Sequence, residues 1–260
     1  MKSIVSCYIT IMKTRLAEKM AYRGDFFISI STILIGDLML PFITYLIYRS
    51  GAAFPGWTLE EVLFIQAVFL LAQGIAFPFF FGIIQLTLNQ VREGTFDILL
   101  LKPRATLFIS LVSSFDIDDF GRLLSGNVLF WFALSHFPFP GIVEWLYFFL
   151  LFLCSLMVLL AFSLIMSALL FKWVGSSRVY DIFDSLTMFG FYPVTIFTRG
   201  FQRLVLYVFP VAMIGFIPAS ILLGRTIDGI EITVMVSVVS LGLGILFWHA
   251  MLKNYTSAGG

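Results

Sequence analysis

Asp37 is an acidic residue well inside a long apolar stretch of the chain. A carboxylate at the centre of a membrane costs at least ~2.5 kcal/mol on insertion scales, and a residue kept there commonly serves the path of an ion, a proton or a substrate. Two interpretations stay open from the sequence. Asp37 acts in transport, for instance as a proton-coupling group, or it makes a structural hydrogen bond to a neighbouring helix, as a carboxylate or as a neutral acid.

Two amides and an aromatic run extend this candidate substrate path. Gln66 and Gln73 are seven residues apart, which places both on one face of a helix. Phe77 opens the run FPFFFGI, an aromatic wall suited to an apolar or amphipathic molecule. The competing interpretation is packing, because glutamines join membrane helices by hydrogen bonds and phenylalanine suits both lipid and protein core.

Two further charged groups lie between apolar stretches. Arg178, Asp181 and Asp184 suit a gate or a docking surface at the cytoplasmic end of a span. The two carboxylates also suit the first turn of a helix, whose N-terminus attracts negative charge. Residues 89–103, NQVREGTFDILLLKP, are either a solvated loop between two spans or a surface contacted by another protein.

Motifs for catalysis are missing from the sequence. It contains no GxxxxGK[ST] loop for ATP and no HExxH, GxSxG or Cys-His cluster. His136 and His249 fall near opposite ends of different apolar stretches, and Cys7 and Cys154 are not expected to meet. We therefore predict no catalytic residue, no metal site and no cofactor bound by this chain. The net charge of +1 gives no sign of nucleic-acid binding.

The elements that must position these residues are membrane helices. Of the 260 residues 60% are hydrophobic and 12% are charged, against about 25% charged in a soluble domain. The apolar runs approach the ~20 residues of a spanning helix rather than the ~10 of a barrel strand. The predicted fold class is an all-α polytopic membrane protein with a single domain over residues 1–260. Six transmembrane helices are expected, at about 26–48, 61–86, 119–137, 143–171, 181–198 and 231–251.

The remaining segments are expected not to span. Residues 1–24 carry apolar side chains at helical spacing among basic ones, which predicts an amphipathic helix in the headgroup layer. Residues 204–224 are long enough to cross, but Pro210, Gly215 and Pro218 favour a broken, re-entrant hairpin. A full crossing, giving seven spans, stays open.

The distribution of Lys and Arg predicts the orientation. Of the 16 Lys and Arg residues, the four that fall on the outer side are Arg49, Arg199, Arg203 and Arg225. The rest fall on the side of the N-terminus. This places both termini in the cytoplasm and the protein in the cell inner membrane as a multi-pass protein.

Several motifs resemble one family along nearly the whole chain. They are YRGDF at 22–26, GWTLEEVLF at 56–64, VREGTFDILLLKP at 91–103, YPVTIF at 192–197, FPVAMIGFIPASILLG at 209–224 and YTSAGG at 255–260. Together they resemble the permeases of the ABC-2 transporter family, in the subgroup that ends in Y-x-SAGG. The stretch at 91–103 is the most specific of them.

The resemblance implies an architecture like that of type V exporters. Residues 1–24 would be an interfacial elbow helix, 86–104 a cytoplasmic coupling loop and 204–224 a re-entrant extracellular hairpin. It implies a transporter of two permeases and two nucleotide-binding ATPase subunits, in which the second permease is a related chain or an identical copy. ATP and Mg would be bound by the partner ATPase. The residues expected to transmit its motion are Arg92, Glu93, Gly94, Thr95 and Asp97.

The predicted function is that of an exporter permease that moves an amphipathic or hydrophobic substrate by alternating access. Two rivals stay open. A secondary transporter or channel without an ATPase would use Asp37 as its coupling group. A lipid-processing membrane enzyme would turn over substrate as an isolated chain, and the lack of a catalytic cluster argues against it.

Overall fold

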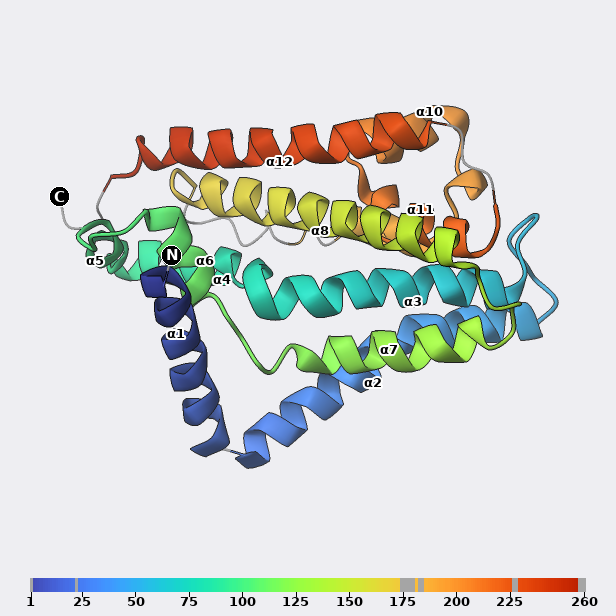
Figure 1. Cartoon of the computed structure of the whole chain (residues 1–260), viewed down its shortest axis with the longest axis horizontal. Helices are drawn as coiled ribbons and strands as arrows, with labels where there is room; N and C mark the ends of the chain where they lie inside the picture. Colours follow the sequence, from blue (N-terminus) through green and yellow to red (C-terminus); the bar gives the residue numbers. More distant parts are fainter. Residues whose placement is uncertain (1, 22, 174–180, 182–184, 226–228, 257–260) are drawn as a thin grey trace.

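The computed structural model describes residues 2–21, 23–173, 181, 185–225 and 229–256, and its regular elements in these ranges are all helical. Five long helices build the molecule, and the first of them runs obliquely to the other four (Figure 1). They are α2 (Arg23–Arg49), α3 (Leu59–Ala76), α7 (Phe120–Leu134), α8 (Ile142–Leu170) and α12 (Ile230–Leu252). The core is built around α3, in which 13 of the 18 residues are buried.

Four of the described helices are long and apolar enough to cross a membrane, namely Gly24–Arg49, Leu59–Glu93, Ile142–Leu170 and Ile230–Leu252. A fifth crossing is possible if the bent pair Arg199–Val208 and Val211–Leu222 forms one span. The prediction of an all-α polytopic membrane protein is therefore confirmed. The number of six spans stays a prediction.

Two of the expected spans are shorter or more broken in the structure than the sequence predicted. The third, expected at 119–137, is α7 with 15 residues, which is about 22 Å of helix against ~30 Å of hydrocarbon. The described part of the fifth, expected at 181–198, is not one helix, since it contains the short 3-10 turns η2 (Met188–Phe191) and η3 (Val194–Ile196). Pro193 separates the two turns, because proline has no N–H to continue a helical ladder.

A proline also shapes the second span. Pro78 lies in the π-turn η1 (Phe77–Phe81) between α3 and α4 (Ile83–Glu93). Its missing N–H leaves a helical carbonyl without its usual donor, and such sites commonly become π-bulges. The carbonyl oxygen of Pro78 accepts a hydrogen bond from the Asp116 N–H at 3.0 Å. The segment before α7 is thereby held against the bulge.

Small residues let α7 approach α3 closely. A Cβ atom on Gly74 would lie 2.5 Å from the Leu123 Cα, and one on Gly126 would lie 2.7 Å from the Leu71 backbone nitrogen. Close approach through glycine is a usual way for membrane helices to pack. This packing fixes the position of α7, which carries Arg122.

The two ends of the molecule differ (Figure 1). Both chain termini lie at one end, with α5 (Phe96–Leu100) and α6 (Thr106–Ser113), and α1 (Lys2–Ala21) runs crosswise to the long helices. At the opposite end lie α10 (Arg199–Arg203), α11 (Phe216–Leu222) and the first turn of α12. The segment expected as a hairpin is bent by 76° near Pro210, and its path through the membrane stays a prediction.

Candidate functional site

The intramembrane acid Asp37 has two partners on α7. Arg122 Nη1 donates a hydrogen bond to Asp37 Oδ1 at 3.3 Å, and Ser125 Oγ donates one to Asp37 Oδ2 at 3.2 Å. Both carboxylate oxygens are thus engaged across the α2–α7 contact. Of the two interpretations of Asp37, this geometry supports the hydrogen bond between helices and gives the carboxylate a cationic partner as well.

Arg122 is shared among several groups. Its Nε lies 3.5 Å from Asp119 Oδ1, and its guanidinium carbon lies 4.1 Å from the centroid of the Phe77 ring. Asp119 is the residue before the first turn of α7 and makes no side-chain cap there. One guanidinium therefore serves two carboxylates and an aromatic face.

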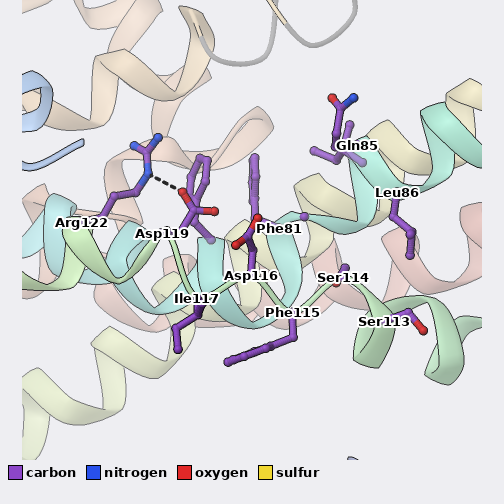
Figure 2. Close-up of a pocket in the computed structure, with 13 residues that line it drawn as sticks. Phe81, Gln85, Leu86, Ser113, Ser114, Phe115, Asp116, Ile117, Asp119 and Arg122 are labelled. Carbon is purple, nitrogen blue, oxygen red and sulfur yellow. Dashed lines mark ion pairs between the residues drawn. The ribbon is translucent and has the colours of Figure 1, made fainter. Parts of the chain in front are cut away.

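A cavity of about 520 Å³ lies beside this cluster, between the π-bulge and the segment that leads into α7. Figure 2 shows the side chains of Asp116, Asp119 and Arg122 on one side and that of Phe81 next to them. Phe77 also lines the cavity, and its ring stacks on that of Phe81 with centroids 4.4 Å apart. Carboxylates and aromatic faces thus meet in one recess.

A smaller cavity of about 270 Å³ shares Arg122 as a lining residue with the larger one. Asp37 and Gln73 line the smaller cavity and Phe77 the larger. Gln66 lines neither of these two; its Nε2 donates to Thr44 Oγ1 at 2.9 Å and joins α3 to α2. Three of the four candidate path residues thus border the two cavities.

Sequence reasoning missed the role of Arg122, which it counted only as a cytoplasmic basic residue. A signal was available, because Asp119, Arg122 and Ser125 recur every third residue and so share a helical face. Nothing in the sequence showed that this face would meet Asp37. That contact depends on how α2 packs against α7.

Helix α4 continues through residue 86 to Glu93, so the first part of the expected coupling segment 86–104 is helical, and its role in coupling stays a prediction. Arg92 and Glu93 are exposed at its end. Gly94 follows with φ of 69°, a left-handed conformation that glycine adopts without strain, and it turns the chain into α5. Thr95 is the N-cap residue of α5 but its side chain makes no capping hydrogen bond, and Asp97 lies in the first turn.

The two faces of α5 differ in character. Phe96 is fully buried, with its ring centroid 5.0 Å from that of Phe171 and 5.1 Å from that of Tyr255. On the other face Leu101, directly after the helix, is 85% exposed and Ile98 is 59% exposed. The segment is therefore anchored to the ends of α8 and α12 by its aromatic residue and presents apolar and charged side chains outward.

The expected cytoplasmic gate is only partly described. Arg178 and Asp184 lie outside the described residues. Asp181 is exposed, and its backbone carbonyl accepts a hydrogen bond from Ser185 Oγ at 2.7 Å. The role of this group as a gate stays a prediction.

Comparison with known proteins gives one match. The family model described as ABC-2 family transporter protein matches residues 34–259, a range that includes Asp37, the Arg122 cluster and the α5 segment. No curated protein and no solved structure matches the chain.

Proposed function

This chain belongs to the ABC-2 transporter family, and from that premise we propose that it is the permease subunit of an ATP-driven exporter. It moves an amphipathic or hydrophobic substrate outward across the cytoplasmic membrane, together with a separate ATPase and a second permease, which is related or identical. ATP and Mg are bound by the ATPase.

The α5 segment is the observation that carries the ATPase partnership. Exposed apolar side chains such as Leu101 and Ile98 lie at the end of the molecule that holds both termini, beside the exposed charges of Arg92 and Glu93. An apolar centre with a charged rim is the usual composition of a protein-binding surface. Lipid would not cover it if this end is cytoplasmic, as the distribution of Lys and Arg indicates.

The anchoring of α5 supports a mechanical role. A displacement of α5 reaches the Phe96 ring, which contacts Phe171 after α8 and Tyr255 after α12. Close-packed aromatic contacts transmit displacement rather than absorb it. ATP binding on the partner then shifts the permease between inward-open and outward-open forms, by binding one of them more tightly than the other.

The proposed topology has six spans, with α1 as an interfacial elbow helix and residues 204–224 as a re-entrant hairpin. The crosswise course of α1 supports the first assignment (Figure 1). The 76° bend near Pro210 and the position of α10 and α11 at one end support the second. Both termini are then cytoplasmic.

The test is copurification of an ATPase with tagged permease in mild detergent, scored by ATPase activity and by mass identification of a nucleotide-binding subunit. The variant Glu93→Arg with Leu101→Asp alters the outward face of α5 and leaves the Phe96 anchor intact. We expect wild type to retain the ATPase and the variant to lose about nine-tenths of it, because a charged group replaces an apolar contact in the interface.

The matched control is Arg199→Glu, a charge reversal at an exposed residue of the opposite end. It should copurify as much ATPase as wild type does. Size-exclusion profiles of all three proteins show whether the permease stays folded. Absence of an ATPase from intact wild-type oligomers would overturn the proposal. If the folded variant retains as much ATPase as wild type, α5 is not the ATPase-binding surface.

A further inference from the structure

The larger cavity has the size and lining of a small-molecule site. Its volume of about 520 Å³ falls within the ~300–1,000 Å³ common for ligand pockets. Residues 114–119, which line most of one side, are not helical although they connect two helices of the bundle. The Asp116 N–H donates to the Pro78 carbonyl oxygen at 3.0 Å, which holds this segment against the π-bulge whose residues Phe77 and Phe81 also line the cavity.

The charge of the lining favours a cation over an anion. Asp116, Asp119 and Arg122 are the charged side chains among the lining residues. Arg122 already has Asp37 at 3.3 Å and Asp119 at 3.5 Å, so an anion would have to displace a carboxylate to reach it. A cation would not have to displace an ion pair to reach Asp116, because Asp116 lies outside that cluster. Its side chain accepts a local hydrogen bond from the Asp118 N–H at 3.0 Å.

The other wall suits an apolar or aromatic body. Phe77 and Phe81 form a stacked pair at the cavity, and Ile84 and Leu86 continue the apolar surface. Aromatic faces attract cations as well as apolar groups. Arg122 already uses this attraction at 4.1 Å from the Phe77 centroid.

We propose that this cavity binds an amphipathic organic cation, with Asp116 holding the positive charge and Phe81 contacting the apolar body. The inference deepens the proposed function by naming the class of transported substrate, and it depends on that function for transport but not for binding. Asp119 contributes to the negative potential of the cavity while it remains paired with Arg122.

The test uses purified permease without ATPase in nanodiscs of zwitterionic lipid, with binding to empty nanodiscs subtracted. The probe is tetraphenylphosphonium, and tetraphenylborate is its counterpart of the same shape and opposite charge. Wild type should bind the cation saturably and at least tenfold more tightly than the anion. Asp116→Asn should weaken cation binding about tenfold, the factor that corresponds to ~1.4 kcal/mol.

Asparagine at position 116 keeps an oxygen that accepts the Asp118 N–H, so the variant preserves the local turn. Glu231→Gln removes an exposed carboxylate from α12, which does not line the cavity, and should bind like wild type. Should Asp116→Asn fail to fold, the same binding measurement on Phe81→Leu provides a second test. It keeps an apolar side chain, loses the ring, and should weaken the cation more than the anion.

Equal binding of the two probes, or full-strength cation binding by both folded variants, would overturn the inference. The result is separable from the copurification test. If the cation binds but no partner ATPase is found, the proposed binding site stands and the proposed exporter function fails. If a functional ATPase complex forms but cation binding is not selective, the exporter function stands and the binding site fails.

Discussion

Two arginines of this protein use the same chemistry in different surroundings. Arg225, which follows α11, donates to both carboxylate oxygens of Glu61 at 2.8 and 2.7 Å and to the Gly56 carbonyl oxygen at 2.9 Å. Its guanidinium carbon lies 3.8 Å from the centroid of a Trp57 ring, and Trp57 Nε1 in turn donates to Thr195 Oγ1 at 2.7 Å. This clamp joins α3 to two segments at the end away from the termini.

Arg122 also has carboxylates and an aromatic face, but its contacts of 3.3 and 3.5 Å are longer and divided between two acids. Arg122 lines both cavities, whereas Arg225 lines neither of these. Short, bidentate contacts fix a position and longer, divided ones permit adjustment. We therefore expect Arg225 to hold structure and Arg122 to tolerate rearrangement as the permease changes state.

The largest expected effect is on stability at the Arg122 cluster. Arg122→Gln leaves Asp37 and Asp119 without their cation in a largely buried place, and should cost about 3 kcal/mol of unfolding free energy. Adding Asp37→Asn should recover a large part of that loss, because one unpaired carboxylate is removed. Denaturant unfolding of Arg122→Gln, Asp37→Asn and the double variant in detergent provides the measurement. Additive losses would mean that the 3.3 Å pair contributes little coupling.

A smaller effect is expected at the clamp. Arg225→Gln removes the bidentate pair with Glu61 and the contact with Trp57, for about 2 kcal/mol. The loss is smaller than at Arg122 because the Arg225 side chain is 37% exposed and water replaces part of the interaction. Unfolding midpoints of the two glutamine variants, measured under the same conditions, test the order. A larger loss at Arg225 would reverse the comparison.

The smallest expected effect on stability comes from replacing each arginine by lysine, which distinguishes the contribution of the guanidinium geometry from that of the charge. Lysine keeps the charge but cannot form the bidentate fork. Arg225→Lys should therefore cost about 1 kcal/mol, while Arg122→Lys should cost less, since its longer contacts do not use that fork. Comparison of the two lysine variants by thermal unfolding is sufficient. Equal losses would mean that both arginines depend on geometry in the same way.

Sequence reasoning predicted the membrane class and the positions of the four long apolar helices, because hydropathy needs no knowledge of neighbours. The role of the segment at 91–103 stays a prediction. Sequence reasoning also noticed Asp37 as an unusual acid. It did not predict the shortness of α7, the break in the segment at 181–198, or the contact between Phe96 and Tyr255. The last two residues lie 159 positions apart in the sequence. The Phe96–Tyr255 contact depends on residues far apart in the chain, whereas the break in the segment at 181–198 has a local cause in Pro193 that sequence reasoning did not use.

The sequence by itself determined that this chain is a bundle of membrane helices with charged breaks, because the cost of exposing polar groups to hydrocarbon adds up locally along a segment. The tertiary structure decided which charge meets which. Asp37 is paired because α7 packs closely on α2, where a Cβ atom on Gly121 would lie 2.9 Å from the Ile30 carbonyl oxygen, and this packing places Arg122 opposite Asp37, 85 positions away in the chain. A sequence pattern predicts which residues share a face of one helix. Which faces of two helices contact each other is determined by how the helices pack.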